Sequence, residues 1–242
     1  MNKQQNETVQ GVMCELIDTF DEYVVCMSFA TQGIRDQGNK LATGSFSSDH
    51  QTWIGSKLDS NPKMHARIKT VECIDKCKEN GGFSNEIRKS LLCTMYSLWD
   101  ELYRHRVAEA SGMDAKDLVC PLMGDLRKIR HCVIHHKSII PETGISFEVL
   151  DWQLPPGKLE ITYEYFLDFN DAVRGDRMRI RSIRLSPEMD NIFKQMTKKE
   201  RKRFEDFHKI KGNKENNVQW PGLEQVLNRI EQVKHQQGAP EA

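Results

Sequence analysis

The chain of 242 residues lacks the features that would place it in a membrane or in an oxidising compartment. No apolar run reaches the roughly 18 residues that a membrane-spanning helix needs. The opening residues, MNKQQNETVQ, lack the basic-then-apolar pattern of a secretion signal. The 7 cysteines are an odd number scattered through apolar or helical segments, which favours buried free thiols over a disulfide framework. We therefore expect a cytoplasmic protein with no membrane partner.

Sequence motifs for nucleotide hydrolysis and serine-hydrolase chemistry are also missing. The chain has neither a glycine-rich phosphate loop with its lysine nor a nucleophile elbow. Its formal net charge is 0 at pH 7, which argues against a protein that simply coats nucleic acid.

The charge is nevertheless uneven along the chain. Residues 171–214 hold 14 Lys and Arg against 7 Asp and Glu. Two interpretations stay open: a solvated helical face beside a strand edge, or a surface that steers phosphates toward a site elsewhere. The residues that we expect to contact RNA are Arg177, Arg179, Arg181, Lys198, Lys199 and Arg201.

Apolar residues recur at three- and four-residue steps over most of the chain, which predicts a mainly α fold. Early in the chain the expected helices are 7–30, 65–80, 84–112 and 121–136, with a glycine- and serine-rich loop between the first two. Later, two short strands or a β-excursion are expected at about 145–165, followed by helices over 165–181, 186–210 and 221–237. The last helix could dock on its own chain, pair with a second copy or stay mobile. This pattern predicts a helical domain over 1–175 and a basic helical extension over 176–242.

The stretch GDLRKIRHCVIHHKSII, residues 124–140, concentrates the residues suited to chemistry. His131 and His135 are one helical turn apart and could hold one metal ion, with Cys73 and Cys77 as further ligands. However, Cys132 stands where the zinc-protease motif has its glutamate, and two core-facing thiols are the simpler interpretation of the CxxxC spacing. Because Cys132 lies near the buried stripe of the helix, we expect its thiol to be inert.

Arg130 and His135 form an R-x4-H pattern that suits phosphodiester chemistry without a metal or cofactor. The arginine can neutralise a phosphate, and the histidine can exchange a proton with a ribose 2′-hydroxyl or a leaving 5′-oxygen. Five residues turn a helix by about 140°, so the two side chains do not share one face. A catalytic site would therefore need two copies meeting in a homodimer. The alternative is an exposed helix face neutralised by acids such as Asp125 or Glu101.

GDLRKIRHCVIHH resembles the signature helix of HEPN domains, an all-helical family of prokaryotic toxins and RNA-cleaving defence proteins. The upstream LLCTMYSLWDELYRHRVAEASG and the downstream VLDWQLPPGKLEIT are similar to a HEPN subgroup, so the resemblance covers about residues 84–165. It implies a dimeric helical bundle that cleaves RNA without metal and leaves a 2′,3′-cyclic phosphate. Within a defence or toxin system, an antitoxin or another protein would be its partner.

The resemblance also implies residue roles. Arg130 would stabilise the phosphate and His135 would act as acid and base, with His131 orienting the substrate and His136 assisting. Asp100, Glu101 and Arg127 would be supporting residues. Many HEPN proteins keep the motif as binding or dimerisation modules, so a non-catalytic module that binds RNA, a nucleotide or a protein is the alternative function. A zinc-dependent hydrolase using His131 and His135 is a third.

Overall fold

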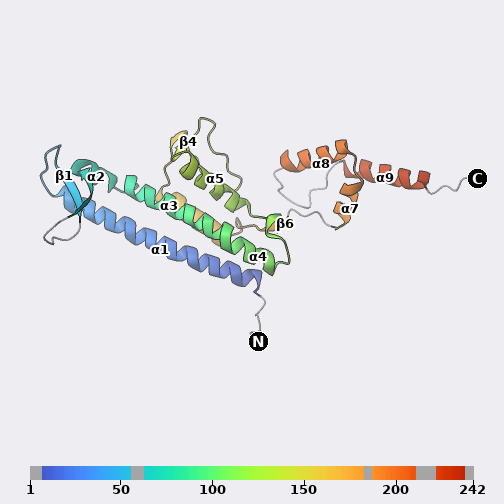
Figure 1. Cartoon of the computed structure of the whole chain (residues 1–242), viewed down its shortest axis with the longest axis horizontal. Helices are drawn as coiled ribbons and strands as arrows, with labels where there is room; N and C mark the ends of the chain where they lie inside the picture. Colours follow the sequence, from blue (N-terminus) through green and yellow to red (C-terminus); the bar gives the residue numbers. More distant parts are fainter. Residues whose placement is uncertain (1–6, 56–62, 183–186, 211–221, 238–242) are drawn as a thin grey trace, which may run out of the picture. The chain divides into compact units, whose positions relative to one another are not determined.

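The computed structural model describes residues 7–55, 63–182, 187–210 and 222–237. Most of these residues are helical and only short two-stranded sheets accompany them, which confirms the mainly α fold (Figure 1). The chain divides into two compact units, Met1–Arg181 and Ser182–Ala242. Residues 176–181 belong to the first unit because Arg177 and Arg181 form ion pairs with Asp168 and Glu148. Within these described ranges, no helix is both long and apolar enough to cross a membrane.

The first helix, α1, runs from Val9 to Ala42 and does not end near residue 30 as predicted. Thr8 caps it by accepting a hydrogen bond from the Gly11 amide. Glycines that were expected to end the helix lie inside it instead. At one of them, Gly38, an added Cβ would overlap the side chain of Cys77, directly after α2 (Thr70–Lys76). This glycine therefore allows close packing between α1 and α2.

A β-hairpin occupies the region where a loop and the start of a helix were expected. Strand β1 (Gln51–Gly55) pairs antiparallel with β2 (Met64–Lys69), so the predicted helix over 65–80 begins only at Thr70. The Thr70 hydroxyl forms hydrogen bonds with Nδ1 of His50 (2.8 Å) and with the Thr52 hydroxyl (2.9 Å). These contacts fix the register of the hairpin at its base, and helical spacing alone cannot reveal them.

The predicted helix over 84–112 forms as a nearly continuous rod of α3 (Gly82–Leu98), the π-helix η1 (Trp99–Tyr103) and α4 (Arg104–Ala110). Helix α3 packs between α1 and α5 (Pro121–His135) and contributes much of the core (Figure 1). Trp99 and Tyr103 of the π-helix are also buried, and the Tyr103 hydroxyl is 2.8 Å from that of Thr19. After α4, the chain reaches α5 through a short 3-10 helix, η2 (Ala115–Asp117), and through β3 (Leu118–Val119), which pairs with β6 (Arg181–Ser182).

The predicted β-excursion contributes only one short strand. Strand β5 (Gly157–Lys158) pairs with β4 (Ile139–Ile140), and residues 145–156 follow an irregular path. Helix α6 (Tyr163–Arg174) begins soon afterwards, capped by the Thr162 hydroxyl. Phe169 of α6 packs against Phe20 of α1, with ring centres 6.2 Å apart.

The second unit has its own small core. The single helix expected over 186–210 is two helices, α7 (Pro187–Gln195) and α8 (Lys198–Ile210). They separate at Thr197, which exchanges hydrogen bonds with Glu200 in a capping box. Helix α9 (Leu223–Gln237) docks on its own chain, because Arg229 pairs with Glu200 at 2.9 Å. The buried residues of this core are Met196, Phe204, Val226 and Ile230.

Candidate functional site

Helix α5 carries the motif and has almost the bounds that the sequence predicts. Pro121 occupies its first turn, where the missing N–H removes no helical hydrogen bond. Its buried residues are Leu122, Met123, Asp125, Leu126, Ile129 and Cys132. The other side of the helix therefore displays the arginines and histidines of the motif.

The chain reversal at the end of α5 places His136, the third histidine of the motif, beside the last helical turn. After His135 the chain reverses through two residues with left-handed backbones, Lys137 (φ 52°) and Ser138 (φ 60°). The buried ammonium of Lys89 donates a hydrogen bond to the Ser138 hydroxyl at 3.0 Å and holds this reversal in place. His136 caps the helix and so lies beside its last turn.

Three exposed histidines form a cluster on this helix. The ring centres of His131 and His135 are 4.8 Å apart, and those of His131 and His136 are 4.9 Å apart. Nε2 of His131 lies 3.2 Å from Nε2 of His136. One of these two nitrogens must carry the proton and the other must accept it, so the pair holds a donor and an acceptor side by side.

The pKa of His131 is lowered from its ordinary value. The first cause is reduced hydration, and the positive charges of His135, His136 and Arg127 lower it further. His131 is therefore neutral at pH 7, which is the form that accepts a proton.

This shift predicts a measurable titration. The His131 ring should titrate below pH 6.5, and His135→Gln or His136→Gln should raise its midpoint by removing a neighbouring positive charge. Because the folded-state pKa is below that of the unfolded chain, the unfolded chain takes up more protons as the pH falls through about 6.5, and the free energy of unfolding should then decrease. Proton NMR of the ring resonances checks this, with exposed His105 of α4 as the control histidine. A His131 midpoint unchanged by both variants would contradict it.

An open groove of about 710 Å³ runs beside the histidine cluster. Helix α5 contributes Arg127, Lys128, His131 and His136, and the loop after β4 contributes Gly144–Ser146. Two further predicted catalytic residues, Arg130 and His135, do not line it.

Arg130 faces a different neighbour from the histidines. Its guanidinium carbon lies 5.6 Å from the centre of the Tyr96 ring on α3, in a cation–π contact. Burial raises the pKa of the Tyr96 hydroxyl, Asp100 raises it further, and Arg127, Arg130 and Arg104 lower it. Within one chain, Arg130 therefore belongs to a patch around Tyr96. Arg127 lies between the two groups, since its charge acts on both Tyr96 and His131.

The acids considered as supporting residues, Asp100 and Glu101, and the acids considered as neutralising an exposed face, Asp125 and Glu101, form no ion pair with the motif among the described residues. Asp100 forms an ion pair with Arg104 at 3.1 Å, and Glu101 is exposed on η1. Asp125 is fully buried, and its carboxylate accepts a hydrogen bond from the Val149 amide. Over the described part of the chain, none of these acids pairs with Arg127, Arg130 or a motif histidine.

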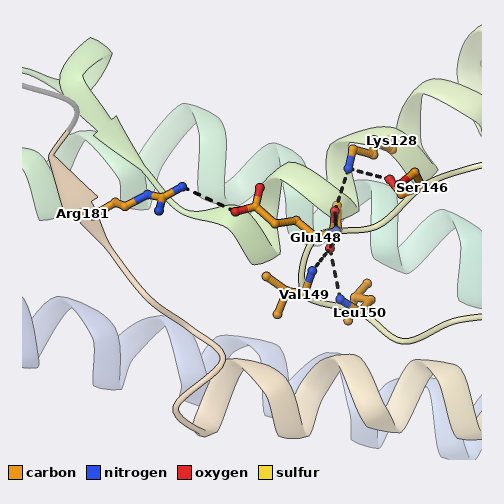
Figure 2. A network of polar contacts seen from close by, with 7 residues as sticks. Lys128, Ser146, Glu148, Val149, Leu150 and Arg181 are labelled. Carbon is orange, nitrogen blue, oxygen red and sulfur yellow. Dashed lines mark hydrogen bonds and ion pairs between the residues drawn. The ribbon is translucent and has the colours of Figure 1, made fainter. Parts of the chain in front are cut away.

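Asp125 has a structural role that the sequence did not predict, because it was considered only as an acid that could neutralise an exposed helix face. Its carboxylate accepts hydrogen bonds from the amides of Glu148, Val149 and Leu150 at 2.7–3.1 Å (Figure 2). It also pairs with Lys128 at 2.9 Å, and Lys128 donates to the Ser146 carbonyl at 2.7 Å. This network joins α5 to the loop that forms the far wall of the groove. The signal in the sequence was an aspartate on the apolar stripe of a predicted helix.

The residues proposed to bind RNA are divided between the two units, and three of them already have partners within their own unit. Arg177 donates to the carboxylate and carbonyl of Asp168, and Arg181 lies 3.5 Å from Glu148. Arg201 stacks on Phe193 and donates to two α7 carbonyls. The exposed members of the set are Arg179, in the first unit, and Lys198 and Lys199, in the second.

The cysteines are free thiols where the structure describes them. Burial raises the pKa of Cys132, and its thiol donates to the Ile139 carbonyl at 3.3 Å, in keeping with an inert core thiol. Cys73 and Cys77 are buried beside α1. Among the residues with described positions, no three His, Cys, Asp or Glu side chains converge in a way that could hold a metal ion.

Comparison with protein-family models, with curated proteins and with solved structures gives no significant match. The resemblance to HEPN domains therefore rests on the motif and its flanking residues.

Proposed function

We propose that the protein is a metal-independent endoribonuclease of the HEPN type, acting in phage defence or as a toxin. The observation that carries the proposal is the outer side of α5. It displays three clustered histidines and two arginines, and no carboxylate among the described residues forms an ion pair with any of them. Proton exchange and phosphate neutralisation are the two tasks of RNA cleavage, and these side chains are suited to them.

The proposed reaction uses the ribose of the substrate as the nucleophile. A neutral histidine removes the proton of the 2′-hydroxyl, the 2′-oxygen attacks the adjacent phosphorus, and the bond to the 5′-oxygen breaks. The same histidine, now protonated, gives its proton to the leaving 5′-oxygen, which yields a 2′,3′-cyclic phosphate and a 5′-hydroxyl. Arg130 stabilises the charge of the phosphate oxygens. His135 is assigned the acid–base role, and the His131–His136 pair orients the substrate.

The proposal requires a second copy of the chain. Arg130 packs on Tyr96, whereas His135 contacts His131 on the other side of the exposed face. Ile134 lies between them on the helix surface and is 54% exposed. In a dimer formed around Ile134, Arg130 of one protomer would approach His135 of the other.

Dimerisation can be tested at this residue. Ile134→Asp should shift the protein from dimer to monomer and remove cleavage, because it places a charge in the buried centre of the interface. Val25→Asp on α1 is a matched control, since Val25 is 53% exposed and lies outside α5. Sedimentation velocity of both variants at one concentration gives the answer. A wild-type monomer, or an Ile134→Asp dimer that still cleaves RNA, would contradict this arrangement.

Cleavage itself is tested with purified wild-type protein, single-stranded RNA or transfer RNA, and excess EDTA. We expect products with 2′,3′-cyclic phosphate ends and no cleavage of an oligonucleotide whose riboses are all 2′-deoxy. Loss of activity in EDTA that zinc restores would favour the zinc hydrolase instead.

A non-catalytic module that dimerises or binds RNA, a nucleotide or a partner protein is the second candidate. The contact of Arg130 with Tyr96 favours it, because this arginine already has a packing role. In that case the wild-type protein would show no turnover, and His135→Ala would weaken the dimer or lower its melting temperature. An antitoxin or defence-system partner would then be sought by binding.

A further inference from the structure

A second cavity, of about 330 Å³, lies at the opposite end of α3 from the π-helix and shares no lining residue with the α5 groove. Its walls come from α1, from the turn between α2 and α3, and from the starts of α3 and α6. Its polar lining includes Arg35, Glu79, Ser84, Arg88 and Tyr163.

Arg88 reaches this cavity with part of its hydrogen-bonding capacity unused. Its side chain is almost fully buried, with 2% of the residue exposed. Nη1 donates to the Ile161 carbonyl at 2.8 Å, whereas Nε has no hydrogen-bond partner among the described residues. A buried N–H without a partner is unfavourable, and the Nε edge of a guanidinium is shaped to bind two oxygens of an anion. The arrangement indicates that Arg88 is completed by a ligand.

The N-terminus of α3 adds donors of the same kind. Its cap residue, Gly81, has no side chain to satisfy the first turn, and that turn contains no acidic residue. The amides of Gly82, Phe83 and Ser84 have no acceptor in the part of the chain that the structure describes. Ser84 lines the cavity, one helical turn before Arg88. Free amides and the positive end of the helix dipole favour an anion here.

The surrounding charges limit how much negative charge the cavity can accept. Arg35 forms an ion pair with Glu79 at 3.1 Å, and Glu79 and Glu164 both act electrostatically on Arg88. Two arginines and two glutamates thus balance, which leaves the helix terminus as the surplus positive charge. This favours one phosphate group over a polyphosphate.

We infer that this cavity binds the phosphate monoester group of a small molecule, through the Nε edge of Arg88 and through Ser84 in the first turn of α3. Beside the arginine edge, the amide and the hydroxyl of Ser84 can donate to the oxygens of the bound group. A phosphate monoester has three free oxygens and matches this set. Tyr163 lines the same cavity and can cover the group that carries the phosphate. This inference does not depend on RNA cleavage.

The test follows the Arg88 Nε–H resonance by ¹⁵N NMR while ribose 5-phosphate, inorganic phosphate or acetate is added at constant ionic strength. Ribose 5-phosphate should shift the Arg88 Nε and Ser84 amide resonances in a saturable way, inorganic phosphate should do so more weakly, and acetate should not. At ten times its Kd, the monoester should raise Tm by about 3–5 °C.

Variants separate this site from general anion binding. Arg88→Lys keeps the positive charge but loses the two-donor edge of the guanidinium. Tyr163→Ala removes the ring that covers the ligand, and Tyr163 is an exposed residue. Arg88→Lys should abolish the Tm shift, Tyr163→Ala should reduce it for ribose 5-phosphate, and Arg174→Met, which removes an arginine paired with Asp21 outside the cavity, should leave it unchanged. If Arg88→Lys does not fold, the wild-type resonances decide the question. An Arg88 signal that no phosphate moves, or equal shifts with acetate, would overturn the inference.

Discussion

His135→Ala and Arg130→Ala are each expected to lower the rate of RNA cleavage by about 10²- to 10⁴-fold, the usual contribution of a general acid–base or an anion-stabilising group. Both side chains lie outside the buried stripe of α5, so the fold and the melting temperature should change little. Single-turnover kinetics on a defined RNA in EDTA measures the effect. His105→Ala on α4 and Arg67→Ala on β2 are matched controls, because both residues are exposed and lie outside α5.

Mixing the two inactive variants tests whether the site is shared between protomers. If Arg130 of one copy acts with His135 of the other, a heterodimer of Arg130→Ala and His135→Ala contains one intact pair and one pair without either residue. Random reassociation should then restore about one quarter of wild-type activity, because about half of the dimers are mixed and each mixed dimer has one intact site out of two. No recovery after verified subunit exchange would place both residues of each pair in one chain, which the contact of Arg130 with Tyr96 argues against. Full activity in either single variant would refute the proposed function.

Asp125→Ala is expected to have the largest effect on stability, a loss of roughly 3–5 kcal/mol in the free energy of unfolding. The carboxylate is fully buried and accepts hydrogen bonds from three consecutive amides. These amides would lose their acceptor, and Lys128 would lose its ion-pair partner. Asn keeps one acceptor oxygen, so Asp125→Asn should lose less. Urea unfolding of each variant, with the exposed Asp151→Ala as the control, measures the difference.

The same variant should also loosen the wall of the groove. Hydrogen exchange at the amides of Glu148, Val149 and Leu150 should accelerate in Asp125→Asn at denaturant concentrations where the protein is still folded (Figure 2). Unchanged exchange, or a stability loss no larger than that of Asp151→Ala, would show that another contact holds the loop.

Much of the helical architecture could be predicted because helix formation is largely local. The bounds of α5 were predicted from Pro121 and the apolar stripe, and the structure agrees with them closely. The predicted helix ends were wrong where contacts with a distant segment of the chain set the local conformation. Gly38 looked like a helix end, yet its role depends on contact with Cys77. Likewise, residues 65–69 were predicted to be helical, yet they form a strand that pairs with β1.

By itself the sequence determined a mainly α chain and the helix that displays Arg130, His131 and His135, because residue spacing along a helix sets which side chains share a face. Tertiary structure alone decided how these groups are divided: Arg130 packs on Tyr96, while the histidines gather beside the groove. It also decided that Asp125 holds a loop more than 20 residues away, and that Arg88 lies buried with an unused donor. The physical reason is the same in each case. Packing and hydrogen bonds between segments distant in the chain fix these arrangements, and periodicity does not record them.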